Sequence, residues 1–154
     1  MEAFLSVDPL APQPEPQLTG RSGQLAARRR EALDDVLAVL ARKSHRPRVV
    51  LYAATEPGEE AGPDLAACRS YVEGLGGWTV TAFHFDDCGR TVPLYERPGW
   101  KQVRASLSGG FARGVVTINR QAVALTDEPY DHLLTWLDSH RAFLDFPVRP
   151  GFDR

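Results

Sequence analysis

The chain has few cysteines and no long hydrophobic run. Its 154 residues include only Cys68 and Cys88, whose spacing matches no CxxC motif. A disulfide-built domain is therefore not expected, and a reducing cytoplasmic compartment fits best. No apolar run approaches the roughly 20 residues that a membrane-spanning helix needs. The first residues show no basic region followed by a hydrophobic stretch, so we expect neither a membrane anchor nor a signal peptide.

The chain also lacks an excess of positive charge and the common nucleotide-binding motifs. A formal net charge of -2 excludes nucleic-acid binding by global attraction, although a local basic patch remains compatible. The patterns GxGxxG and GxxxxGK[ST] are absent, so we predict no nucleotide cofactor and no other cofactor. His84 and Asp86 share one face of a predicted strand, but without a third ligand they predict no metal site.

The composition is that of an ordinary globular domain, with 43% hydrophobic and 25% charged residues. Residues 1–22 are rich in proline and are predicted to be a disordered leader. Residues 23–46 predict an amphipathic helix or arm, and residues 47–154 predict one α/β domain.

The arm has two interpretations. Within residues 23–43 a stripe of apolar side chains recurs at steps of three and four: Leu33, Val36, Leu37 and Leu40. The run Arg28–Arg30 precedes this stripe. A helix docked on the domain or on a second subunit is favoured, because such a run usually forms a solvated face. The alternative is a basic arm for nucleic acid.

Beyond the arm, predicted strands and helices alternate. This order predicts a three-layer fold with a mainly parallel sheet and helices on both faces. Ligands in such folds bind outside the carboxyl ends of the strands. The predicted strands are 48–53, 78–85, 114–118 and 143–146, and the predicted helices are 62–75, 97–108 and 128–141.

Three short motifs follow the predicted strands. They read Tyr-Ala-Ala-Thr-Glu at 52–56, Glu-Arg-Pro-Gly-Trp at 96–100 and Asn-Arg-Gln-Ala-Val at 119–123. Over residues 48–146 their order resembles the catalytic domain of serine recombinases, the resolvase and invertase family. The family motifs there are of the types Tyr-Ala-Arg-x-Ser, Asp-Arg-Pro-Gly-Leu and Asp-Arg-Leu-x-Arg.

The resemblance implies a resolvase-like α/β domain with a phosphate-handling site. Tyr52 matches the tyrosine of the first motif, and Arg97 and Arg120 match active-site arginines. We therefore expect these two arginines to be the residues that could bind an anion. The alternative is that they are structural, with Arg97 on the surface at a helix start and Arg120 paired with a carboxylate: Glu56, Asp86 or Asp87.

The same motifs predict a degenerate site. Strand exchange in this family needs a hydroxyl that attacks a phosphodiester and arginines that offset the developing charge. Here Glu56 stands in the place of the serine, and a carboxylate about 4 Å from a phosphate is repelled by about 4 kcal/mol at an effective dielectric near 20. Three further departures are Ala54 for an arginine, Asn119 for the aspartate and Val123 for the last arginine.

The leading hypothesis is a catalytically inactive recombinase-like domain that acts as a regulatory or interaction module related to DNA recombination. One alternative is an active strand-exchange or cleavage enzyme with Thr55 as a relocated nucleophile. This would need either a one-residue shift of the motif alignment or a turn that redirects the side chain. Another is a non-catalytic DNA-binding protein. The candidate partners are a second copy of the chain, another protein or DNA.

Overall fold

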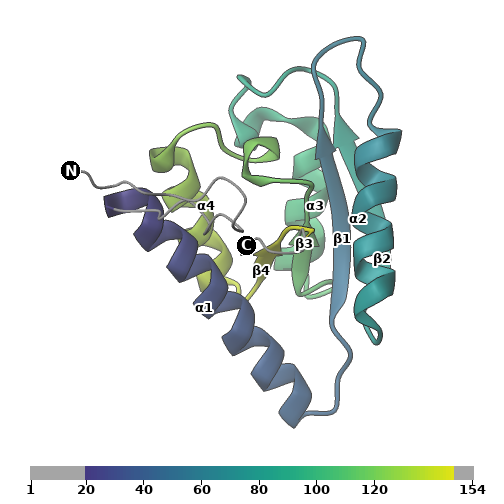
Figure 1. Ribbon diagram of the computed structural model, residues 1–154, viewed down its shortest axis with the longest axis vertical. Helices are drawn as coiled ribbons and strands as arrows, with labels where there is room; N and C mark the ends of the chain where they lie inside the picture. The colour runs from purple at the N-terminus through teal and green to yellow at the C-terminus, as the bar shows by residue number, and fades with distance from the viewer. Residues whose placement is uncertain (1–19, 148–154) are drawn as a thin grey trace, which may run out of the picture.

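The computed structural model describes residues 20–147, which form helices and strands in alternation (Figure 1). The strands are β1 (Arg48–Ala54), β2 (Thr79–Asp86), β3 (Gly114–Val116) and β4 (Phe143–Asp145). The helices are α1 (Gly20–Arg42), α2 (Gly62–Leu75), α3 (Pro98–Ser108) and α4 (Asp127–Ser139), with single 3-10 turns at η1 (Leu94–Glu96) and η2 (Arg120–Ala122). No helix within this part of the chain is long and apolar enough to cross a membrane.

The four strands form one parallel sheet in the order β2-β1-β3-β4, with β1 at its centre. Successive side chains of a strand point to opposite faces. Val50 and Tyr52 accordingly join the core beneath α3 and α4, whereas Val49 and Leu51 join the core beneath α1 and α2. The predicted α/β fold, with a parallel sheet and helices on both faces, is confirmed.

Helix α1 covers the β4 edge of the sheet and lies beside α4 (Figure 1). Its Leu25 joins the α3–α4 core and its Leu33 joins the α2 core, so one helix closes both layers. The predicted N-terminal helix is therefore docked on the rest of the same chain.

The run Arg28–Arg30 does not form the solvated face that is usual for such runs. Arg28 makes ion pairs with Asp131 at 2.6 Å and Asp138 at 3.2 Å, both on α4. Arg29 is 1% exposed, and its guanidinium donates to the carbonyl of Leu144 at 2.9 Å. The helical pattern of the sequence cannot show which arginines face the rest of the protein, since the residues that pair with Arg28 and Arg29 lie more than 100 positions away in the sequence.

Element ends differ from the predicted ones by a few residues. Helix α4 ends at Ser139 instead of residue 141, because Arg141 adopts a left-handed φ of 53°. Strand β3 ends at Val116 instead of residue 118, and the Thr117 hydroxyl then donates to the carbonyl of Asn119 in a turn. Of the Pro-rich leader predicted for residues 1–22, residues 1–19 lie outside the described residues. Residues 20–22 belong to α1 and are helical.

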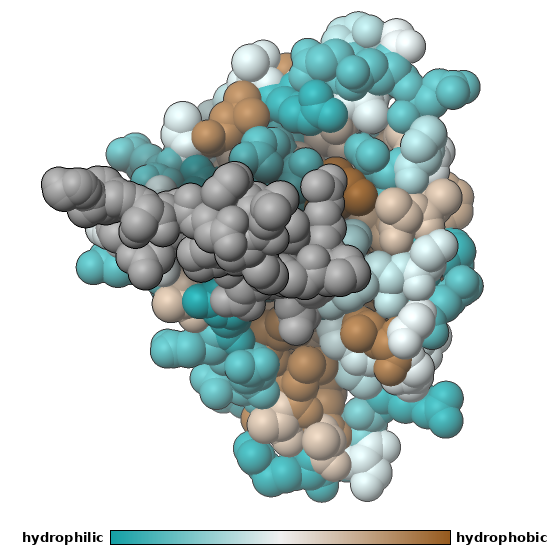
Figure 2. All heavy atoms as spheres, in the orientation of Figure 1, coloured by the Kyte–Doolittle hydropathy of each residue, from teal (hydrophilic) through white to brown (hydrophobic). Residues whose placement is uncertain are grey.

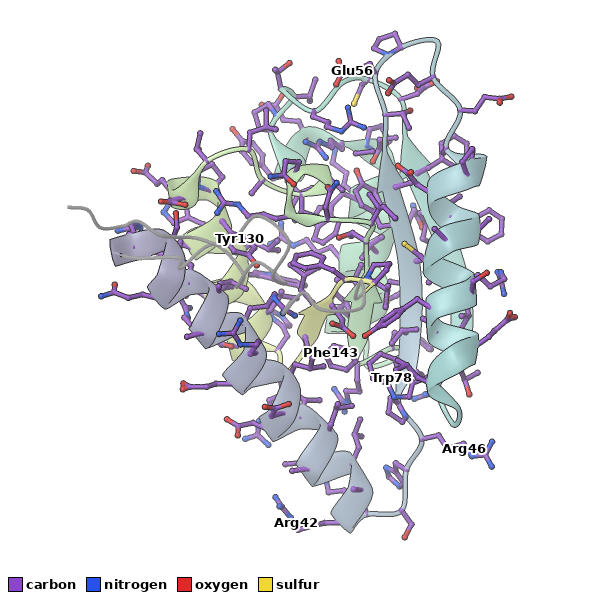
Figure 3. The ribbon with its side chains drawn as sticks, viewed as in Figure 1. Arg42, Arg46, Glu56, Trp78, Tyr130 and Phe143 are labelled. Atoms are coloured by element: carbon purple, nitrogen blue, oxygen red, sulfur yellow. The ribbon has the colours of Figure 1, made fainter. Side chains whose placement is uncertain are left out.

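Gly114 gives a test of the packing beneath the sheet. A Cβ at this position would overlap the ring of Phe143, which packs edge-on against Trp78 with ring centroids 5.4 Å apart (Figure 3). We expect Gly114→Ala to lower the free energy of unfolding by about 1–3 kcal/mol, as overpacked cores do.

The matched control is Gly74→Ala on the exposed face of α2, where no atom lies near an added Cβ. Alanine there should raise stability by up to about 1 kcal/mol, because glycine is a poor residue for a helix interior. Urea unfolding of both variants measures the difference, and equal effects would contradict the packing described for Gly114.

Candidate functional site at the carboxyl ends of the strands

The buried carboxylate of Asp86 organises the carboxyl end of the sheet. It accepts hydrogen bonds from the hydroxyl of Tyr52 at 2.8 Å and from the backbone N–H groups of Gly99 at 2.7 Å and Trp100 at 2.9 Å. A helix N-terminus has unpaired N–H groups and favours negative charge. Asp86 therefore joins β1, β2 and the first turn of α3 through one side chain.

The hydroxyl of Tyr52 stays protonated in this arrangement. Tyr52 has no exposed surface, and its ring meets Trp100 edge-on with centroids 5.2 Å apart. Burial raises the pKa of Tyr52 well above its usual value of 10.0. Tyr52 is thus a permanent hydrogen-bond donor to Asp86.

Arg97 is buried and directs its guanidinium at backbone carbonyls. Its Nε donates to Val92 at 2.9 Å, its Nη1 to Ala122 at 2.6 Å and its Nη2 to Arg90 at 2.9 Å. The same Nη1 lies 3.4 Å from the hydroxyl of Tyr52, and the residue is 1% exposed. Within the described residues Arg97 has no carboxylate within ion-pair distance, so it neither lies on the surface nor pairs with Glu56, Asp86 or Asp87. It ties the loop after β2 to the η2 turn.

Arg120 has a different set of neighbours. Its Nη2 lies 3.0 Å from a carboxylate oxygen of Asp127, and its guanidinium stacks 4.7 Å from the ring centroid of Tyr130. Its Nε is buried and makes no hydrogen bond. Arg120 therefore pairs with a carboxylate at the start of α4, which the sequence did not indicate as its partner.

Glu56, which the motif comparison aligns with the serine of the family, directs its carboxylate at Arg90. It accepts from the backbone N–H of Arg90 at 3.0 Å and lies 3.4 Å from Arg90 Nη1. The ion pair is partly exposed and so contributes little to stability. Its effect is to neutralise the charge of Arg90 at this end of the sheet.

The remaining positions of the motifs are apolar or serve the backbone. Ala54 and Val123 are each 2% exposed within the α3–α4 core. The side chain of Asn119 accepts from the N–H of Ala122 at 3.2 Å and caps η2. Thr55 is 2% exposed, and its hydroxyl is buried without a hydrogen-bond partner. A nucleophile needs an adjacent base, which this hydroxyl lacks among residues 20–147.

A cavity of about 540 Å³ adjoins Arg97 between α3 and α4. Its lining is mainly apolar, with Leu94, Trp100, Leu133 and Trp136 among the contributors. Arginines also contribute to the lining, but Arg97 directs its nitrogens at carbonyls, Arg90 faces Glu56 and Arg104 lies over the ring of Trp136. The described residues contain no group of three or more His, Cys, Asp or Glu side chains that could bind a metal ion, and both oxygens of Asp86 already accept hydrogen bonds.

Sequence reasoning missed Arg90 and the role of Asp86. Arg90 lies in a loop with no motif of its own, so only the fold brings it to Glu56. The signal that could have indicated Asp86 is its place at the end of a strand, ahead of an Arg-Pro-Gly helix start that needs an acceptor for its N–H groups.

Two solved structures share this arrangement of strands and helices. The C-terminal catalytic domain of ISC1926 TnpA, an IS607-like serine recombinase, aligns with a TM-score of 0.57 at 14% sequence identity, over 66% of this chain and 70% of that one. The N-terminal catalytic domain of TP901-1 integrase aligns with a TM-score of 0.57 at 15% identity, over 63% of this chain and 74% of that one. The fold is that of a serine recombinase catalytic domain. No family model matches the chain, and no curated protein matches it.

Asp86 and its neighbour Asp87 form a matched pair for a stability test. We expect Asp86→Ala to lower the free energy of unfolding by about 2–4 kcal/mol, because three donors, two of them buried, lose their acceptor. Asp87 is exposed, so Asp87→Ala should change the free energy of unfolding by less than about 0.5 kcal/mol. Denaturant titration with circular dichroism gives both values, and a small effect at Asp86 would argue against its role.

Arg97 gives the second test of the site. Arg97→Met should lower the free energy of unfolding by about 3 kcal/mol or more, because it leaves three carbonyls without a donor. Arg97→Lys should recover little of this stability, since an ammonium cannot reproduce the planar, forked geometry of the guanidinium. The control is the exposed Arg69→Met. If thermal and urea unfolding find Arg97→Met as stable as Arg69→Met, Arg97 is available for a ligand and is not structural.

Proposed function

We propose that this chain is a catalytically inactive, serine-recombinase-like domain that acts as a regulatory or interaction module related to DNA recombination. The fold of residues 20–147 supports the connection to recombination. The loss of catalysis and the regulatory role rest on the chemistry of the candidate site.

The observation that carries the proposal is the pairing of Glu56 with Arg90. A scissile phosphate needs a nearby hydroxyl and uncompensated positive charge. Glu56 supplies a carboxylate in the place of that hydroxyl, and it also neutralises a cation in the adjoining loop. Both effects oppose the binding and the cleavage of a phosphodiester.

The environments of the two matching arginines support the same conclusion. Arg97 donates from each of its three nitrogens to a carbonyl, and Arg120 pairs with Asp127. Binding a phosphate with Arg97 would require these hydrogen bonds to break, with the carbonyls left unpaired in a buried site. We therefore assign both residues a structural role inherited from the fold.

The buried hydroxyl of Thr55 weighs against the enzymatic alternative. An attack on DNA would require it to leave a site where it is 2% exposed and to find a base. Its backbone is also fixed, because its N–H donates to the carbonyl of Asp86 and its carbonyl accepts from Gly89.

The test is a search for a covalent protein–DNA adduct. The full chain is incubated with a pool of supercoiled plasmids that carry random inserts, and the reaction is stopped in denaturant. We expect no DNA to remain attached to the protein, whereas an active serine recombinase on its own substrate, as the control, gives a clear adduct.

An adduct with the unmodified chain would overturn the proposal of inactivity. If that adduct disappears in Thr55→Ala and persists in Glu56→Ala, Thr55 is the relocated nucleophile. Mass spectrometry of the nuclease-trimmed adduct identifies the modified side chain in either case.

A further inference from the structure

A second cavity, of about 850 Å³, lies at the amino ends of the strands. It is bounded by the last turns of α1, the start of β1, the residue before β3 and the turn between α4 and β4. Figure 3 places Arg42 and Arg46 at this end of the molecule and Glu56 at the opposite end. This cavity, which we call the basic groove, is thus separate from the candidate site at the carboxyl ends.

The floor of the basic groove is an apolar stripe on α1. Ala32, Val36 and Val39 recur at steps of four and three and so lie on one side of the helix. Val39 is 39% exposed, and Ala32 and Val36 are half-buried. Figure 2 shows hydrophobic atoms on the surface in the lower half of the molecule, with hydrophilic side chains around them.

The rim of the basic groove is cationic. It consists of Lys43, Arg46, Arg48, Arg113 and Arg141. Within residues 20–147 none of these side chains lies within ion-pair distance of a carboxylate. The only carboxylates in the lining are Asp35 and Asp138, and Asp138 already pairs with Arg28.

Two of the cationic residues are neighbours on adjacent strands, and one of them, Arg48, donates from its guanidinium to the carbonyl of Gly110 at 3.2 Å. Val49 of β1 pairs with Gly114 of β3, so the preceding residues Arg48 and Arg113 lie side by side, and the N–H of Arg113 donates to the carbonyl of Arg48 at 2.8 Å. Like charges on adjacent strand positions repel each other. A bound carboxylate between them would remove that repulsion.

Helix dipoles explain only part of this charge. The carbonyl ends of α1 and α4 favour nearby cations, and the effect is limited to about the last turn. That accounts for Lys43 and Arg141. It does not account for Arg46, Arg48 and Arg113, which lie at or just before the starts of strands.

We propose that the basic groove binds an acidic, amphipathic helical segment of a protein partner. A helix of this kind can place its apolar side chains on Val36 and Val39 and its carboxylates beside Arg46 and Arg113. Duplex DNA could pair its phosphates with the cations of the rim, but its backbone offers no apolar group that would cover the floor. The two halves of the groove are therefore best matched by one acidic amphipathic ligand.

This inference gives the proposed interaction module a class of partner and rests on that part of the proposed function only. The adduct experiment concerns the other end of the sheet, so the two can fail separately.

The test is a titration of the full chain with a fluorescent peptide of about 18 residues, built from Glu and Leu with Leu on one helical face. A peptide of the same composition with its leucines dispersed around the helix is the first control, and a labelled duplex DNA is the second. We expect the amphipathic peptide to bind at least about fivefold more tightly than the dispersed peptide.

Neutral substitutions separate the rim from the floor. Arg46→Gln with Arg113→Gln should weaken binding of the amphipathic peptide about tenfold, and Val36→Ser with Val39→Ser should weaken it about fivefold. The exposed pair Arg69→Gln and Lys101→Gln, away from the groove, should change it less than about twofold. Circular dichroism confirms folding, and Val39→Ser alone replaces the double variant if that variant unfolds.

Four outcomes would overturn the inference. Equal binding of the two peptides means that the floor is not used, and absence of binding means that the groove has no such ligand. A nucleic-acid surface would be identified if duplex DNA binds more tightly than the peptide. In that case the arginine variants should weaken DNA binding and the serine variants should leave it unchanged. Sedimentation that shows a dimer abolished by the serine variants would instead identify an interface between two copies.

Discussion

The structure depends on a buried cluster in which Asp86 accepts from Tyr52 and from two N–H groups of α3, while Arg97 fastens the surrounding loops. A buried carboxylate is tolerated only when its oxygens are satisfied, and a buried guanidinium only when its donors are. Here each requirement is met by a different element of the fold. The cluster therefore fixes the positions of β1, β2, α3 and η2 relative to one another, and any loosening would leave several buried groups unpaired.

Because the buried polar groups of this cluster already have hydrogen-bond partners, the carboxyl end of the sheet is limited in what it can bind. A phosphate site needs donors that are held in place but not yet used. Arg97 is held in place by the carbonyls of Val92, Arg90 and Ala122, and those hydrogen bonds engage each of its three nitrogens. Stability and anion binding thus compete for one guanidinium, and the hydrogen bonds of this chain favour stability.

Much of the fold could be predicted from the sequence because periodicity and turn residues act locally. The order of strands and helices followed from apolar runs bounded by Gly and Pro, and the recombinase fold followed from three motifs in order. The partners of charged residues could not be predicted, since they depend on contacts between distant segments. Arg29 lies beside Leu144, Arg120 beside Asp127 and Glu56 beside Arg90 only once the sheet has formed.

The two ends of the sheet handle charge in opposite ways. At the carboxyl end Glu56 pairs with Arg90, Arg120 pairs with Asp127, and Arg97 donates to carbonyls. A charged ligand that binds these side chains would first have to break those interactions. At the amino end Arg48 and Arg113 lie on adjacent strands with no carboxylate within ion-pair distance among residues 20–147, and the guanidinium of Arg48 donates to the carbonyl of Gly110. An incoming carboxylate can pair with these cations without first breaking an ion pair inside the protein, and their desolvation offsets only part of that gain when the pair stays at the surface. In this chain the capacity for recognition therefore lies at the end of the sheet opposite to the site that its fold would suggest.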